Sequence, residues 1–411
     1  MSNSTMETVR SVDIRSRINR VIGSLYSTIV AGLATIALTT NAYAEASHPV
    51  RLTLILLLLI GSHLIMVPRL WFGRELKIYL AFLGYMYLSL LWTTNVPLAM
   101  DTLTLATNFE LILMLFGALV VYHNRRAVFT GMFAGFVIAA AMYTLTQHFP
   151  FTYPVGFSYN SIAGMYLFGL FATIMFGWFT RRVVIPIGTS LVLLLLVAAT
   201  TSIKTNLGIA LGSGAAGLLY FRHFVRAMRK TLLLFIVLGV AIVVAIRSND
   251  AVVERIDAGV DRVNNGIQVL ANREDDSNGT ATFDLRRQWK DQGLKGWRQN
   301  PILGYGVEGF RADVGITSHS TPIDLLYNSG LIGFVLFYAA LLSIGWRLYR
   351  AMEYSAAGLR AFLTGLLICY LFITLSGTMY YDAFLAVFVG TSAAILSSRR
   401  PEGRSGGEDY F

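Results

Sequence analysis

Long apolar stretches separated by short polar connectors occupy most of the 411-residue chain. A helix that crosses a lipid bilayer needs about 20 mostly apolar residues. Stretches of about that length lie near residues 21–40, 52–68, 76–93, 104–122, 127–147, 161–179, 183–200, 205–221, 231–247, 322–346, 361–376 and 382–397. The pattern predicts an all-α, polytopic integral membrane protein with about 12 transmembrane helices.

One long polar segment, near residues 248–321, interrupts this pattern. The expected division is nine spans within 1–247, a loop domain over 248–321, three spans within 322–398 and a tail over 399–411. Inside the loop, apolar residues recur at helical spacing over 252–270, which indicates an amphipathic helix on the membrane surface. A second helical stretch, DLRRQWKDQGLKGW, is followed by helix-breaking Pro301, Gly304 and Gly306.

The composition agrees with a membrane protein and excludes other classes. Apolar residues make up 55% of the chain and charged residues 14%, whereas soluble domains carry about 45–50% and about 25%. Single soluble cores stop growing near about 250–300 residues, so this excess rules out a soluble enzyme, and also a disordered or fibrous protein. Cys369 is the only cysteine, which excludes an intrachain disulfide and a cysteine-based metal site.

The positions of the basic residues predict an orientation. The net charge of +10 would suggest nucleic acid in a soluble protein. If the N-terminus is cytoplasmic, the inner segments carry 21 Lys and Arg residues and the short outer connectors carry only Arg51 and Lys204. This asymmetry follows the positive-inside rule, so both termini are expected to be cytoplasmic and no nucleic acid is needed. The sequence NAYAEA resembles a signal-peptide cleavage site. The apolar run before it exceeds the usual length of about 7–15 residues for the apolar region of a signal peptide, so the first span is expected to be a true membrane helix.

His319 is the most informative polar residue, because it directly precedes the expected tenth span on the outer side. Thr321 can cap that helix, and Asp324 suits its first turn, so both are expected to be structural. A helix N-terminus favours an anion, and a histidine there can accept a proton near neutral pH. The alternative is an interfacial histidine bonded to a carbonyl group.

Three basic residues are candidates for binding phosphate. Adjacent Arg286 and Arg287 point about 100° apart on a helix, so only one of them can face a site, and the sequence does not decide which. A guanidinium binds phosphate in bidentate fashion, although a solvated basic face is equally consistent with the pair. Lys204 either extends to the membrane interface or makes a second phosphate contact.

Acidic residues are less specific. Asp382, at the start of the last span, could orient His319, pair with Arg286 or cap its own helix. Glu110 lies inside the fourth span, where an acid is a functional candidate, but its role stays open. Residues 274–276 form an acidic run in a polar loop, which is more typical of solvated charges than of a metal site.

Lys204, Arg286, His319 and Asp382 could therefore converge at the outer membrane interface. Two cations can stabilise a pyrophosphate leaving group, and a histidine can take the proton of an attacking hydroxyl. This set suits group transfer from a phosphate-activated lipid, with no metal or other cofactor required.

Two segments carry a resemblance to a known family. DLRRQWKDQGLKGWRQNPILGYGVEGF and SHSTPIDLLYNSGLIG resemble the motifs of the bacterial O-antigen ligase family, within the O-antigen ligase and polymerase superfamily. The resemblance implies transfer of a glycan from undecaprenyl pyrophosphate to lipid A–core, at the periplasmic face of the bacterial inner membrane, in lipopolysaccharide assembly. It implies His319 as general base, Arg286 and Lys204 on the pyrophosphate and Asp382 as an orienting group, with inversion and without metal or nucleotide. Arg287 remains a rival of Arg286.

Other activities are open at this point. An O-antigen polymerase would use a second lipid-linked glycan as acceptor, but polymerases tend to have two sizeable outer loops and this chain has one. A protein-glycosylating ligase of the same superfamily is a further alternative. A polyprenyl-glycan transporter should show inverted repeats and broken, charged helices at the midplane, but this sequence has only Glu110 within a span and its polar cluster lies at the outer edge. A membrane scaffold is the least favoured alternative, because it gives no reason for His319 beside a helix start.

Overall fold

The computed structural model describes residues 3–43, 49–147, 159–200, 202–219, 253–254, 257, 278–350 and 357–397. The elements of these residues are helices: α1 (Asn3–Tyr43), α2 (Pro49–Met66), α3 (Arg74–Leu88), η1 (Ser89–Leu91), α4 (Val96–Tyr122), α5 (Arg125–Gln147), α6 (Tyr159–Thr180), α7 (Val184–Ala199), α8 (Ile203–Leu219), α11 (Asn278–Gln299), α12 (Gly309–Val314), α13 (Thr321–Arg350), α14 (Ala357–Thr374) and α15 (Ala383–Ser397). The expected span 231–247, the amphipathic stretch 252–270, the acidic run 274–276 and the tail 399–411 lie outside the described residues, two short fragments of 252–270 excepted.

The all-α, polytopic membrane class is confirmed. Each expected apolar stretch other than 231–247 coincides with a helix. In the described part of the chain, seven helices are long and apolar enough to cross a membrane, and α7 and α15 are shorter apolar helices. Such helices suit a bilayer because they satisfy their backbone hydrogen bonds internally.

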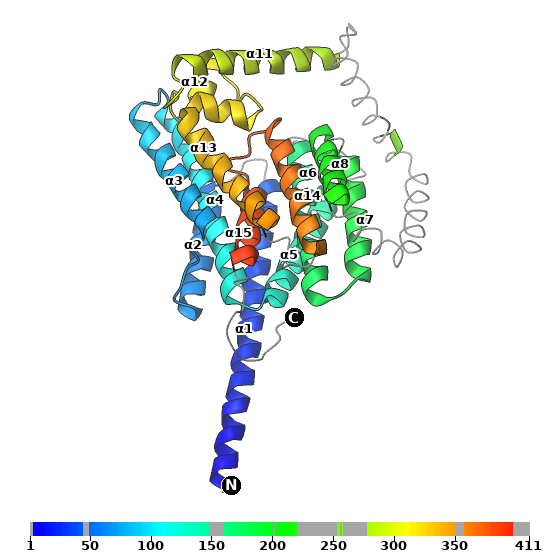
Figure 1. Cartoon of the computed structure of the whole chain (residues 1–411). Helices are drawn as coiled ribbons and strands as arrows, with labels where there is room; N and C mark the ends of the chain where they lie inside the picture. The colour runs from blue at the N-terminus through cyan, green and yellow to red at the C-terminus, as the bar shows by residue number, and fades with distance from the viewer. Residues whose placement is uncertain are drawn as a thin grey trace.

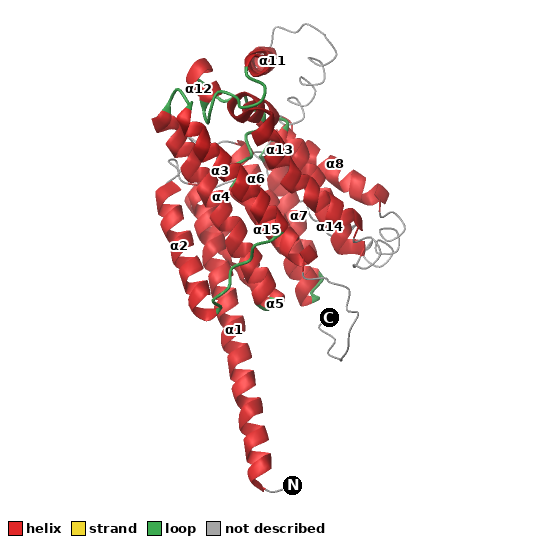
Figure 2. Ribbon diagram, turned by 60° about the vertical axis from the view of Figure 1, so that its left-hand side comes forward, coloured by secondary structure: helices red, strands yellow, loops and turns green. Residues whose placement is uncertain are grey.

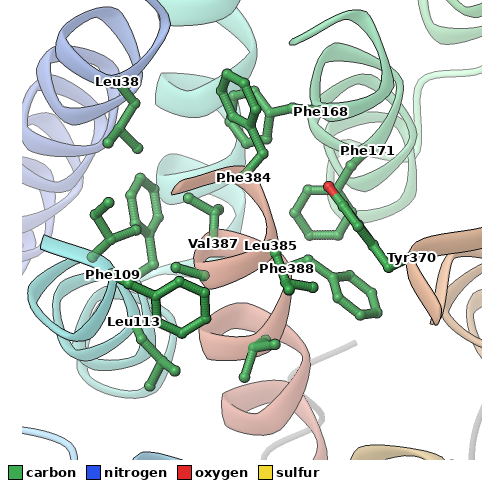
Figure 3. Packing of buried hydrophobic residues seen from close by; sticks show 14 of the residues in the cluster. Leu38, Phe109, Leu113, Phe168, Phe171, Tyr370, Phe384, Leu385, Val387 and Phe388 are labelled. Carbon is green, nitrogen blue, oxygen red and sulfur yellow. The ribbon is translucent and has the colours of Figure 1, made fainter. Parts of the chain in front are cut away.

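The core lies around α15, between α4 on one side and α6 and α14 on the other. Figure 3 shows Phe109 and Leu113 of α4 facing α15, with Phe168 and Phe171 of α6 on its other side. Every residue of α15 from Phe384 to Ile395 is buried. A helix that is apolar all round is buried on all sides, which explains why this short helix can occupy the centre of the bundle.

The two ends of the bundle differ. α11 lies across one end, whereas α1 extends beyond the bundle at the other (Figure 1). We call the end that carries α11 the site end. Helix α11 packs on the beginning of α13 there, and it ends at Gln299, just before the helix-breaking run predicted at Pro301.

Helix α13 is broken at Gly330, where φ is 59° and ψ is −161°. Residues 301–306 lie against the break and replace the missing helical hydrogen bonds. The N–H groups of Tyr305 and Gly306 donate to the carbonyls of Tyr327 and Asn328, and those of Leu331 and Ile332 donate to the carbonyls of Pro301 and Ile302. The expected tenth span, 322–346, coincides with α13, and the break within it is a feature that the apolar pattern does not indicate.

Two glycines make this crossing of backbones possible. A Cβ at Gly330 would lie 2.2 Å from the carbonyl oxygen of Ile302, and a Cβ at Gly304 would lie 2.6 Å from the carbonyl carbon of Asn328. Both glycines also have positive φ values, which other residues adopt only at a cost. Gly304 of NPILGYG and Gly330 of LLYNSG thus serve one structural purpose, since they let two main chains meet.

Candidate active site

Four segments of the chain meet at the site end. They are helix α11, the loop before α13, the start of α8, and the loop 375–382 that joins α14 to α15. Thr321, the first residue of α13, connects the loop before α13 to the loop 375–382. Its N–H donates to the carbonyl of Gly377 over 3.0 Å, and its hydroxyl also bonds that carbonyl and accepts from the N–H of Met379 over 2.8 Å. The expectation that Thr321 caps its own helix is wrong, because its hydroxyl binds the neighbouring loop.

Asp324 fixes the other side of the same junction. Its carboxylate accepts a hydrogen bond from the Ser318 N–H over 3.0 Å and one from the Thr378 hydroxyl over 2.7 Å. The side chain is 2% exposed. Its role is structural, as the sequence predicts, but it holds two loops rather than only its own first turn.

His319 lies in the loop held by these contacts. Its φ of 56° is in the left-handed region, which is uncommon for residues other than glycine and is found at functional sites. The imidazole is half-buried, and its centroid lies 5.6 Å from the Trp289 ring of α11. No hydrogen bond to a carbonyl or any other described group is found for this ring.

The electrostatic surroundings of His319 favour its neutral form. Burial lowers the pKa of the imidazole, and the positive charges of Arg286 and Lys204 lower it further. A neutral imidazole keeps a free nitrogen lone pair at neutral pH, so His319 can accept a proton there. The structure therefore brings His319, Arg286 and Lys204 within electrostatic reach of one another, from three separate parts of the chain.

Lys204 reaches this place because α8 and α14 pack closely. A Cβ at Gly212 would lie 2.2 Å from the carbonyl oxygen of Gly365, so the two backbones touch in the small-residue manner of membrane helices. At the site end of this pair, the Lys204 Nζ donates to the carbonyl of Ser376 over 3.4 Å. A Cβ at Gly377 would lie 2.5 Å from that Nζ, so glycine leaves room for the ammonium group.

The rotation of α11 distinguishes the two arginines. Gly293 and Gly296 press against the side chains of Ile323 and Tyr327 of α13, which fixes one face of α11 against the bundle. Arg286 is half-buried, and its Nε is buried without a hydrogen-bond partner among the residues that the structure describes. Arg287 is exposed. Buried polar groups normally have partners, so the unpartnered Nε leaves Arg286 with a donor available to a ligand.

Asp382 caps its own helix. Its Oδ1 accepts a hydrogen bond from the Leu385 N–H over 2.8 Å in the first turn of α15. Its carboxylate also interacts electrostatically with Lys204. Within the described residues, it makes neither an ion pair with Arg286 nor a hydrogen bond with His319. The geometry brings Asp382 to the site through Lys204 and does not bring it to the imidazole.

Glu308 is a buried acid that sequence reasoning missed. Its φ is 62° and its side chain is 3% exposed. The Thr102 hydroxyl of α4 donates to its Oε1 over 2.7 Å. Burial raises the pKa of this carboxyl, which the Thr102 bond and the Arg311 charge partly offset, while Asp324 raises it further. The only signal in the sequence is an acid between two glycines in YGVEGF.

Other acids give no metal site in the described part. Glu110 is buried in α4, and its Oε2 has no hydrogen-bond partner in the described ranges of the chain. Within the residues that the structure describes, no group of three or more His, Cys, Asp or Glu side chains could hold a metal ion.

Comparison with known proteins finds a family model. Residues 188–338 match the model described as O-antigen ligase. This part of the chain is therefore an O-antigen ligase domain. The matched segment contains Lys204, Arg286, Arg287 and His319. The family is linked to lipopolysaccharide-related glycan transfer and implies lipid-linked glycan substrates. No curated protein is significantly similar to the chain.

Proposed function

We propose that this enzyme transfers O-antigen glycan from undecaprenyl pyrophosphate to lipid A–core at the periplasmic face of the bacterial inner membrane. The observation that carries the proposal is the approach of His319 to Arg286 and Lys204 at the site end. An imidazole beside two cations fits a reaction in which a hydroxyl loses a proton while a diphosphate leaves.

In the proposed reaction, His319 accepts the proton of the acceptor hydroxyl. The hydroxyl oxygen attacks the anomeric carbon of the glycan, and the bond from that carbon to the phosphate oxygen breaks. Attack from the opposite side inverts the anomeric centre. Undecaprenyl pyrophosphate leaves with both electrons of the broken bond, and Arg286 and Lys204 compensate its negative charge. Asp382 keeps Lys204 in place, and no metal ion is needed because two side chains supply the positive charge.

The same proposal includes a topology. We place twelve spans in the membrane, nine before residue 248 and three after residue 321, with the loop 248–321 periplasmic and both termini cytoplasmic. The distribution of Lys and Arg supports this orientation. One long loop instead of two favours ligase over polymerase. The N-terminal end of α1 and helix α11 lie at opposite ends of the bundle (Figure 1), which supports this topology.

The test uses proteoliposomes that contain the full chain and one lipid-linked glycan donor. Lipid A–core and a second lipid-linked glycan compete as acceptors. Extension of lipid A–core supports the ligase, whereas elongation of the lipid-linked glycan alone replaces it with the polymerase. Loss of donor from the outer leaflet without any new glycosidic bond would indicate transport.

Two alanine variants of histidines, one at the site and one far from it, provide the control for this assay. His319→Ala should abolish transfer while donor binding remains. His123 follows the last residue of α4, about 30 Å along that helix from Thr102 at the site end. The His123→Ala enzyme should therefore keep its transfer activity. If the His319→Ala enzyme also kept its transfer activity, His319 would not be the general base.

A further inference from the structure

A second set of polar side chains lies at the site end, on α12 and on the loop 375–382. Glu308 is the N-cap residue of α12, and Arg311 follows three residues later. Tyr381 belongs to the loop. We call Glu308, Arg311 and Tyr381 the polar triad. Figures 1 and 2 both show α12 at the same end of the bundle as α11. The reaction proposed above uses none of these three residues.

Asn328 of α13 brings the two elements of the polar triad together. Its Oδ1 accepts a hydrogen bond from the Phe310 N–H of α12 over 2.8 Å. The Tyr380 hydroxyl lies beside the same Asn328 side chain, and the ring centroids of Tyr380 and Tyr381 are 4.9 Å apart. Helix α12 and the two tyrosines therefore meet on the first turns of α13.

Asp324 connects the polar triad to the loop of His319. Its carboxylate accepts hydrogen bonds from the Ser318 N–H, next to His319, and from the hydroxyl of Thr378, three residues before Tyr381. The charge of the same carboxylate acts on Tyr381. The polar triad thus borders the loop that carries the proposed base.

The cations proposed for the pyrophosphate form a separate set. The charges of Arg286 and Lys204 act on His319, whereas Glu308 interacts with Arg311 and with a carboxylate of α13. In an inverting displacement, the acceptor and the leaving group lie on opposite sides of the anomeric carbon. A site for the acceptor should therefore lie beside the base and apart from the pyrophosphate cations, as the polar triad does.

The chemistry of the polar triad suits a sugar. Arg311 is exposed and Tyr381 is half-buried, and neither side chain makes a hydrogen bond with another residue that the structure describes. Burial raises the pKa of the Tyr381 hydroxyl, and the neighbouring carboxylates raise it further, so this hydroxyl stays protonated and can donate. Sugar hydroxyls accept from such donors, whereas the carboxylates of Glu308 and Asp324 would repel a further phosphate.

Glu308 is a costly residue at its position. Its φ of 62° lies in the left-handed region, which glycine adopts without strain and other residues adopt at a cost. Its side chain is also 3% exposed, and burial of a carboxylate is unfavourable. The hydrogen bond from Thr102 and the charge of Arg311 offset part of this cost. Strained residues of this kind are typical of functional sites.

We propose that Arg311 and Tyr381 bind hydroxyl groups of the acceptor sugar, and that Glu308 is a positioning residue that holds Arg311 for this contact. The proposal rests on the proposed function, because it assumes that His319 activates an acceptor hydroxyl. Arg311 and Tyr381 hold the sugar while His319 takes the proton of the reacting hydroxyl. They contact the acceptor and not the donor, so their loss should change the KM of one substrate only.

The test uses proteoliposomes that contain the full chain, with saturating lipid-linked glycan donor and varied lipid A–core. Arg311→Gln should raise the KM for lipid A–core at least about tenfold, and Tyr381→Phe should raise it about fivefold, because one hydrogen bond of the acceptor is charged and the other neutral. Both variants should keep kcat and the KM for the donor within about twofold.

Two variants provide matched controls. Arg298→Gln removes an exposed positive charge in the last turn of α11, and Tyr349→Phe removes a hydroxyl at the opposite end of α13. Both should keep the KM for lipid A–core. Thermal unfolding of all four variants should match the wild type, since the exchanged side chains are exposed or lose only a hydroxyl.

A double-mutant cycle tests the role of Glu308. Glu308→Gln keeps an oxygen that can accept from the Thr102 hydroxyl, and it removes the charge near Arg311. It should raise the KM for lipid A–core about threefold, and it should have no further effect in the Arg311→Gln enzyme. An equal effect in both backgrounds would show that Glu308 does not act through Arg311, and would overturn its positioning role.

Two kinetic outcomes overturn the proposal. Either Arg311→Gln and Tyr381→Phe keep the wild-type KM for lipid A–core, or they raise the KM for the donor instead, which would assign the polar triad to the donor glycan. Binding of fluorescent lipid A–core to the His319→Ala enzyme needs no transfer. Arg311→Gln in that background should raise the Kd about tenfold, and an unchanged Kd overturns the proposal.

Failure of the proposed function would look different. If the wild-type enzyme extends the second lipid-linked glycan and not lipid A–core, the ligase is replaced by the polymerase. The same KM comparison, made with that glycan as acceptor, then decides whether Arg311 and Tyr381 bind the acceptor sugar.

Discussion

Replacing Gly330 by alanine tests whether the break in α13 is a requirement of the fold. The new methyl group would lie 2.2 Å from the carbonyl oxygen of Ile302 and 2.8 Å from the backbone nitrogen of Gly304. Backbone atoms cannot move aside as a flexible side chain can. The φ of 59° with ψ of −161° is a conformation that costs a residue with a Cβ about 1–3 kcal/mol.

The expected loss of stability follows from these two effects. Relief of the overlap must separate residues 301–306 from the break, which weakens at least one of the four hydrogen bonds between them. Each such bond is worth about 1 kcal/mol, so Gly330→Ala should lower the free energy of unfolding by at least about 2 kcal/mol. Transfer should fall as well, because the first turns of α13 hold the loop of His319 through Thr321 and Asp324.

The assay combines thermal unfolding in detergent with hydrogen exchange at the amides of Tyr305 and Gly306, which donate to α13. Gly84→Ala is the control, since a Cβ at Gly84 meets no atom within 4 Å. Alanine is favoured over glycine in helices by about 1 kcal/mol, so this control should be neutral or stabilising. Equal stability of the two variants, with unchanged exchange at both amides, would refute the reasoning.

Two further predictions concern the site. Arg286→Gln removes a charge that lowers the pKa of His319, so the pKa of His319 should rise. The loss of transfer on acidification should then begin at a higher pH. The KM for the donor should also increase, because the donor loses a cationic contact. Arg287→Gln should change neither the pH profile nor the KM, and the opposite pattern would make Arg287 the donor-binding residue. Asp324→Asn should lower kcat more than it changes KM, because the loop of His319 loses an ionised acceptor for Ser318; an unchanged kcat would show that this anchor is dispensable.

The helices could be predicted because their signal is local. A run of about 20 apolar residues has few stable conformations in a bilayer other than a helix, so the stretches 104–122 and 361–376 coincide with α4 and α14. The break at Gly330 had no such signal. It depends on residues 301–306 lying beside α13, and that contact exists only in the folded protein.

The candidate site shows the same division between local and tertiary information. Residue types and their helix positions were enough to propose His319, Lys204 and the arginine pair as candidates, and their roles stay predictions. The choice between Arg286 and Arg287 depends on the rotation of α11, which Gly293 and Gly296 set through their contacts with α13. Thr321 was assigned a local cap because its partner, the Gly377 carbonyl, lies 56 residues away.

These tertiary contacts also explain how like charges stay together. Burial lowers the pKa of His319 most, and the charges of Arg286 and Lys204 lower it further because they would repel a charged imidazole. The Asp382 carboxylate offsets part of the repulsion on Lys204. The glycine contacts of α8 with α14 and of α11 with α13 fix the helices that carry Lys204 and Arg286. In the proposed function, the diphosphate of the donor would remove that repulsion, and its binding free energy would add to the stability of the fold. Groups that are already in place would need little reorganisation when negative charge develops on the proposed leaving group.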